Sequence, residues 1–114
     1  MLDVTPLLTA VDRFADRLRA MPQSALVRGA AAEGLGLARE LAGRAQRIEF
    51  PGRAPAELPD AGIFAVGDQL AVAGHDLAEA LRTAGGAPGA GPKALAEAVA
   101  LVEAAESRAL TARR

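Results

Sequence analysis

The amino-acid sequence predicts an all-α protein, a single antiparallel up-down four-helix bundle that comprises residues 1–114. Four segments repeat apolar residues at alternating steps of three and four, which is the spacing of a buried helix face. Stretches containing Pro and Gly separate these segments. A chain of 114 residues, 51% of them hydrophobic, is long enough for one domain with its own core. We expect helices near residues 6–21, 25–48, 60–84 and 93–112.

The first helix begins at Thr5-Pro6, where Thr5 can cap the first turn and Pro6 suits the first helical position. Pro22 ends it, and Ser24 can cap the second helix after a very short turn. Helices one and two should therefore be antiparallel neighbours. Their expected inner faces comprise Leu7, Val11, Phe14, Leu18 and Met21 in the first helix, and Val27, Ala31, Gly34, Ala38, Leu41, Ala45 and Ile48 in the second.

The segment from residue 49 to 58 reads as a linker because it contains Pro51, Gly52 and Pro55. About ten residues is long for a connection within a bundle. We expect Phe50 and Leu58 to anchor it across one end of the bundle.

The segment from residue 59 to 84 is the most apolar long stretch, and we interpret it as the central helix, beginning at Pro59-Asp60. Its glycines at positions 67 and 74 lie on the same side as the apolar residues. Glycine inside a helix costs about 1 kcal/mol relative to alanine, so close approach of another helix is the expected compensation. The inner face comprises Ile63, Val66, Leu70, Ala73, Leu77, Ala80 and Ala84.

Phe64 and Val72 lie on the opposite face of the central helix, more than about 100° from Leu70 on a helical wheel. One explanation is that a second part of the chain covers this face. The other is that Phe64 and Val72 form a self-association interface, which predicts a homodimer. The sequence leaves both explanations open.

A second linker, from residue 85 to 91, is rich in Gly and Pro and precedes a last helix that begins at Pro92. The last helix is rich in alanine, so it should bury less area than the others.

Composition excludes several classes of site. The chain has no cysteine, which excludes disulfides and Cys-based metal sites. The net charge is −1, and there is no signal peptide and no apolar run long enough to span a bilayer. We therefore expect a cytoplasmic protein that binds no membrane. Nucleic-acid binding is disfavoured because the chain lacks a helix-turn-helix signature and aromatic residues for base stacking.

His75, the only histidine, is one turn from Glu79 and two turns from Asp68, so the three side chains can share a helix face. Imidazole and carboxylates can bind a divalent metal. However, carboxylate-bridged metal sites in bundles use Glu-x-x-His pairs, and Val72 occupies the glutamate position here. We therefore assign no metal site, no catalytic residue and no cofactor, and retain His75, Glu79 and Asp68 as weak metal candidates only.

These observations favour a non-enzymatic protein-interaction or regulatory module that forms a homodimer and binds an unknown protein partner. The alternative is a small-ligand-binding bundle whose pocket lies near the second linker. A third hypothesis is a metal-dependent enzyme centred on His75. An exposed apolar patch, an enclosed apolar cavity and carboxylates converging on His75 would distinguish the three.

Overall fold

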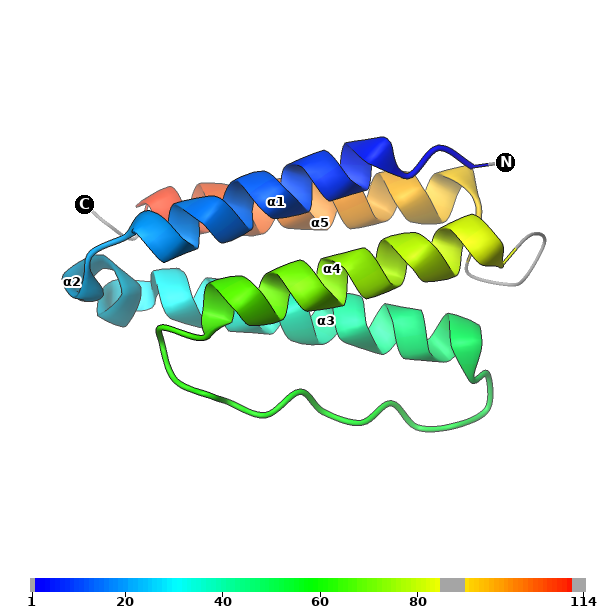
Figure 1. The fold of residues 1–114 in the computed structure, drawn as a ribbon, viewed down its shortest axis with the longest axis horizontal. Coiled ribbons are helices and arrows are strands. Elements are labelled where there is room, and N and C mark those ends of the chain that lie inside the picture. The colour runs from blue at the N-terminus through cyan, green and yellow to red at the C-terminus, as the bar shows by residue number, and fades with distance from the viewer. Residues whose placement is uncertain (1, 85–89, 112–114) are drawn as a thin grey trace.

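The computed structural model describes residues 2–84 and 90–111, and within these ranges every element of secondary structure is helical. Four long helices form a bundle, which confirms the all-α four-helix fold (Figure 1). No helix in the described ranges is both long enough and apolar enough to cross a membrane. The helices are α1 (Thr5–Ala20), α2 (Gln23–Ala25), η1 (Leu26–Ala30), α3 (Ala31–Glu49), α4 (Val66–Thr83) and α5 (Pro92–Thr111).

The route of the chain through the bundle differs from a simple up-down-up-down order. Gly34, near the start of α3, lies against Val66 at the start of α4, whereas Ile48 near the end of α3 lines one pocket with Leu81 near the end of α4. Helices α3 and α4 are therefore parallel neighbours. Helix α1 packs mainly on α4 and α5. Helices α1 and α3 were expected to be antiparallel neighbours. They do run in opposite directions, but they lie diagonally across the bundle from each other (Figure 1).

The parallel arrangement depends on the long crossover between residues 50 and 65. Its 16 residues can span about 50 Å when extended, at about 3.3 Å per residue. The 19 residues of α3 rise only about 28 Å, at 1.5 Å per residue. The crossover is therefore long enough to return along the whole helix, and it does so in Figure 1.

Helix α4 begins at Val66, six residues later than the expected start at Asp60. The carboxylate of Asp60 accepts a hydrogen bond from the Gly62 amide at 2.8 Å, which closes a local turn. Gly62 has a φ of +95°, a conformation that an α-helix cannot include. Asp60 therefore stabilises the turn before the helix rather than the helix itself.

Gly29 interrupts the regular helix that was expected from residue 25 onward. Its φ is 148°, and the surrounding segment η1 has the wider π-type turn. The bulge changes which side chains face the core. Leu26 is buried, whereas Val27, expected on the inner face, is 65% exposed.

The expected core face of the central helix is confirmed. Val66, Leu70, Ala73, Leu77 and Ala80 are all buried, while Ile63 and Ala84 at its ends are half-buried. The close helix approach expected at the two glycines is also confirmed. A Cβ atom at Gly74 would overlap the side chain of Val11, and one at Gly67 would lie 3.0 Å from the carbonyl oxygen of Ala15.

Three side chains hold the crossover against the bundle. The Gln46 amide donates to the carbonyl of Ala56 at 3.2 Å and accepts from its N–H at 2.8 Å. Arg39 donates to the Leu58 carbonyl, and Gln69 donates to the Pro59 carbonyl, each at 2.8 Å. Leu58 is half-buried, but Phe50 is 49% exposed beneath Arg53 and does not serve as the expected anchor.

Candidate functional site

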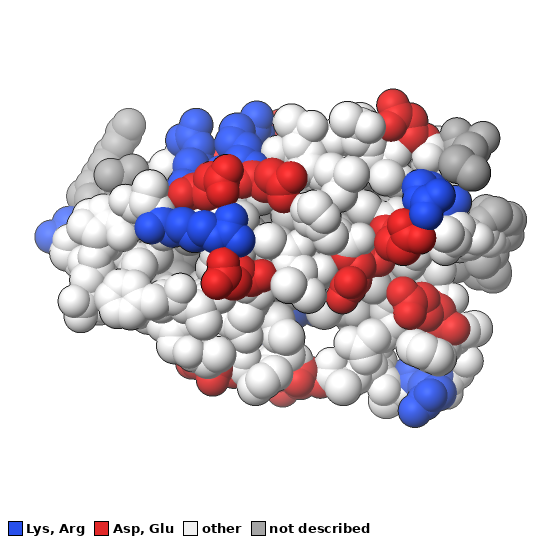
Figure 2. Space-filling model, viewed as in Figure 1, with Lys and Arg blue, Asp and Glu red and all other residues white. Residues whose placement is uncertain are grey.

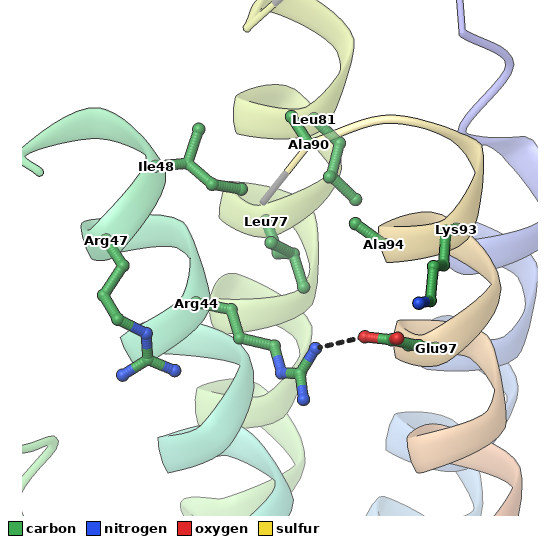
Figure 3. Close-up of a pocket in the computed structure, with 9 residues that line it drawn as sticks. All are labelled: Arg44, Arg47, Ile48, Leu77, Leu81, Ala90, Lys93, Ala94 and Glu97. Carbon is green, nitrogen blue, oxygen red and sulfur yellow. Dashed lines mark hydrogen bonds and ion pairs between the residues drawn. The ribbon is translucent and has the colours of Figure 1, made fainter. Parts of the chain in front are cut away.

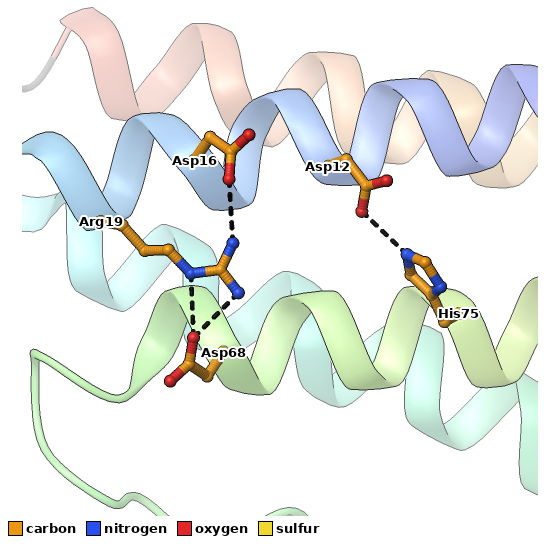
Figure 4. A network of polar contacts seen from close by, with 5 residues as sticks. All are labelled: Asp12, Asp16, Arg19, Asp68 and His75. Carbon is orange, nitrogen blue, oxygen red and sulfur yellow. Dashed lines mark hydrogen bonds and ion pairs between the residues drawn. The ribbon is translucent and has the colours of Figure 1, made fainter.

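The structure places His75 beside Asp12 of α1 instead of bringing it together with Asp68 and Glu79 (Figure 4). The Nε2 atom of His75 lies 2.8 Å from an Asp12 carboxylate oxygen. An ionised carboxylate only accepts hydrogen bonds, so this nitrogen carries the hydrogen. Both side chains are about half exposed, and the pair links α1 to α4 at the molecular surface.

The other two metal candidates contact arginines. Asp68 accepts hydrogen bonds from Arg19, which also contacts Asp16 at 2.9 Å (Figure 4). The hydrogen bond to Asp68 is the main reason that the pKa of Arg19 lies above its ordinary value. Glu79 forms a two-pronged ion pair with Arg82. In residues 2–84 and 90–111, no three His, Cys, Asp or Glu side chains are arranged to hold a metal ion.

Phe64 and Val72, the candidate interface residues, are both exposed. Phe64 is 71% exposed and Val72 is 62% exposed, the largest and third largest values among the four exposed large apolar side chains in residues 2–84 and 90–111. Neither the crossover nor α5 buries them within a single copy of the chain. Their exposure leaves this surface accessible to another molecule.

A shallow groove of about 300 Å³ lies between η1, the start of α3 and the residues that lead into α4. Ile63, the residue before Phe64, forms part of its wall together with Val27 of η1. This groove was not predicted from the sequence, because the helical pattern placed Val27 inside the core and continued a regular helix through residue 63. The remaining lining residues are Leu26, Ala31, Ala32, Leu35, Asp60, Gly62 and Val66.

A larger pocket of about 650 Å³ lies between the ends of α3 and α4 and the start of α5 (Figure 3). Glu97 is the only acidic side chain among the described residues that line it. Ala90 of the second linker contributes to the wall, so the pocket lies where the ligand-binding alternative expected one. The lining residues are Arg44, Arg47, Ile48, Leu77, Leu81, Ala90, Lys93, Ala94 and Glu97.

One buried carboxylate, that of Glu106, was not predicted from the sequence. Glu106 of α5 is 8% exposed and lies 3.2 Å from Arg13 and 3.1 Å from Arg17 of α1. Val102 and Ala109, which lie one helical turn from Glu106 on either side, were the available signal, since a charged residue on an apolar helix face is buried only when paired. Helices α1 and α5 run parallel in Figure 1, and this packing brings Glu106 beside both arginines.

Charge on the face formed by α1 and α4 is mixed, as Figure 2 shows by neighbouring acidic and basic side chains separated by uncharged surface. No large patch of one sign covers this view of the described residues. Comparison of the chain with protein-family models, with curated proteins and with solved structures finds no match.

Proposed function

We propose that this chain is a non-enzymatic interaction module that forms a homodimer through the surface carrying Phe64 and Val72. The observation that supports this function most strongly is the 71% exposure of Phe64, which follows Ile63, a residue of the apolar groove, in the sequence. An exposed apolar side chain beside an apolar depression is typical of protein–protein contact sites.

A two-fold symmetric dimer is the simplest association that uses both features. In such an interface the same patch serves both subunits, so each Phe64 can enter the groove of the other copy. The groove is bounded by apolar side chains and one carboxylate, Asp60, which already accepts the Gly62 amide hydrogen bond. A phenyl ring would therefore enter the groove without displacing an ion pair.

Val72 extends the apolar surface along α4. It lines a second shallow groove, of about 270 Å³, together with Leu58 of the crossover and Ala42 of α3. The interface would thus combine the beginning of α4 with the crossover segment. The three side-chain contacts that hold the crossover would also fix the shape of this surface.

The energy available from these residues suits a dimer of moderate affinity. Burial of an apolar side chain such as Phe or Val contributes roughly 1.5–3 kcal/mol. Two copies of each residue would contribute several kcal/mol, and the loss of translational and rotational freedom would offset much of this. We expect a dissociation constant of about micromolar order.

Sedimentation velocity over a range of concentrations tests the proposal, with circular dichroism as the check on folding. We expect the parent chain to sediment as a dimer at high concentration and Phe64→Asp to remain a folded monomer. Phe50→Asp is the matched control. Phe50 is 49% exposed and follows the end of α3, far from the start of α3 where the groove lies, so this substitution should leave the sedimenting mass unchanged.

A parent chain that stays monomeric at high concentration would reject the homodimer. Unfolding of Phe64→Asp would instead assign Phe64 to the core of the monomer. A dimer that Phe64→Asp leaves intact would place the interface elsewhere.

A further inference from the structure

The pocket between α3, α4 and α5 has an apolar floor and a positively charged rim. Leu77 and Leu81 form the floor and are otherwise buried in the bundle core. Ile48, Ala90 and Ala94 complete its apolar wall. In Figure 3 the side chains of Arg44 and Lys93 extend from α3 and α5 towards the space between the two helices.

The cations at this rim are weakly paired compared with those elsewhere in the bundle. Arg44 lies 3.4 Å from Glu40 and 3.5 Å from Glu97, and Arg47 lies 3.4 Å from the same Glu40 oxygen. Strong ion pairs have distances of about 2.7–2.9 Å. By contrast, Arg19 and Arg108 each lie 2.8 Å from a carboxylate.

Lys93 is available for a ligand. Its side chain is exposed, and it makes no hydrogen bond or ion pair with any residue in the part of the chain that the structure describes. The pocket lining carries three cations and one carboxylate, a difference of +2. Arg44 is shared between two glutamates, so Lys93 remains to balance one negative charge.

We propose that this pocket binds a small amphipathic carboxylate, a molecule with one carboxylate head and an unbranched aliphatic chain. The head would pair with Lys93, and the chain would lie against Leu77, Leu81 and Ile48. A volume of about 650 Å³ falls within the 300–1,000 Å³ range typical of small-molecule sites.

The lining chemistry disfavours ligands that are polar along their whole length. Among the described residues that line the pocket, none has an aromatic, hydroxyl or amide side chain. A nucleotide would therefore lack an aromatic stacking partner, and a sugar would leave many of its hydroxyls without hydrogen bonds. An alkyl chain needs neither. Its burial would remove apolar surface from water at both the ligand and the floor of the pocket.

Calorimetry and amide NMR with decanoate test this proposal, at concentrations below its self-association. We expect saturable binding that shifts the amide signals of Lys93 and Ala94. Decanol has the same chain without the charge, and decylammonium has the opposite charge. Both should bind at least about tenfold more weakly, since a charge-assisted hydrogen bond contributes about 1.5–3 kcal/mol.

Two variants distinguish the head from the chain. Lys93→Gln removes an exposed cation and should weaken decanoate binding by about tenfold. Ala94→Leu places an isobutyl group in the half-buried wall and should abolish binding while the helix content stays unchanged. Arg53→Gln is the matched control, because it removes a cation on the crossover, outside the pocket, and should bind decanoate as the parent does.

Vesicles of phosphatidylglycerol separate a soluble ligand from an anionic membrane surface. At a protein concentration at which decanoate saturates the pocket, we expect no binding of the protein to the vesicles. The proposal is overturned if decanoate moves no amide near the pocket, or if Lys93→Gln and Ala94→Leu both bind as the parent does. Equal binding of decylammonium, or capture by the vesicles through Lys93, would also contradict it.

Discussion

Gly74 of α4 lies directly against Val11 of α1, with no space between the helices for even a methyl group. The contact sets how closely α1 and α4 approach. It explains why a helix in the centre of the bundle tolerates a residue that disfavours helices.

Gly74→Ala should therefore destabilise the protein by about 1–3 kcal/mol, because the added methyl group must push Val11 aside. Gly36→Ala is the control within a helix, since a Cβ atom there meets nothing within 4 Å. That change should stabilise the fold by up to about 1 kcal/mol through helix propensity. Denaturant unfolding measures both. Equal effects of the two substitutions would contradict the close packing at Gly74.

Leu70→Ala should cost about 2–5 kcal/mol of unfolding free energy, because Leu70 is 0% exposed at the centre of the core. Val72→Ala, two residues further along the same helix and 62% exposed, should change the stability of the monomer by less than about 0.5 kcal/mol. Urea midpoints at a concentration that keeps the protein monomeric give the comparison. A midpoint for Leu70→Ala equal to that of the parent would show that the core is assigned incorrectly.

The core face of α4 could be predicted because it depends on local spacing alone. Leu70, Ala73 and Leu77 are three or four positions apart, and an α-helix brings such residues to one side whatever its neighbours are. The requirement for small residues at positions 67 and 74 was predictable for the same reason.

The direction of α4 could not be predicted in the same way. It depends on where the helix begins. The sequence suggested that Asp60 caps the helix, whereas in the structure Asp60 closes a turn around Gly62. A start at residue 60 leaves a linker of about ten residues, which the sequence suggested would cross one end of the bundle to an antiparallel neighbour. The actual start at Val66 leaves a crossover long enough to return along α3.

Contacts between helices could not be predicted from the sequence for a related reason. The ion pairs of Glu106 with Arg13 and Arg17 connect residues about 90 positions apart in the sequence. The pocket beside Lys93 likewise needs the ends of α3 and α4 at the same end of the bundle. Helical periodicity says which side of a helix is buried but does not say which helix covers it.

The Gln46–Ala56 contact predicts that the crossover is an ordered part of the domain. Gln46→Ala removes two hydrogen bonds and should speed hydrogen exchange at the Ala56 amide, with a loss of about 1 kcal/mol in stability at this exposed site. Gln46→Glu keeps the acceptor for the Ala56 N–H but loses the donor to its carbonyl, so it should have a smaller effect on that amide. Unchanged exchange in both variants would mean that Gln46 does not hold the crossover.

Protonation of Asp3 in acid should cause a small loss of order at the start of α1. Hydrogen bonds from the Thr5 side chain, and then from its backbone N–H, hold the pKa of Asp3 below the ordinary value of 3.8. A lowered folded-state pKa means that the ionised form stabilises the fold. This contribution is complete above pH 3.8 and is lost as the pH falls through the folded-state value.

An NMR titration of the Asp3 side chain should therefore give a midpoint below 3.8 in the parent. In Thr5→Ala the hydroxyl is missing, and the midpoint should move back towards 3.8. A parent midpoint at or above the ordinary value would show that the contact with Thr5 does not form in solution.

Glu106 gives the sharpest test of the parallel packing of α1 and α5. Its carboxylate is almost fully buried, while Arg13 and Arg17 are each 48% exposed, so solvent weakens the ion pairs without removing them. Glu106→Gln keeps the size of the side chain and loses the charge, and it should reduce the unfolding free energy by about 1–3 kcal/mol. Glu103→Gln, on the exposed side of the same helix, should change it by less than about 0.5 kcal/mol. Urea unfolding at low and high salt distinguishes the cause, because screening should narrow the difference between Glu106→Gln and the parent only if the lost interaction is ionic. If α5 instead ran antiparallel to α1, Glu106 would lie away from both arginines, and the two glutamine variants would have equal stability at every salt concentration.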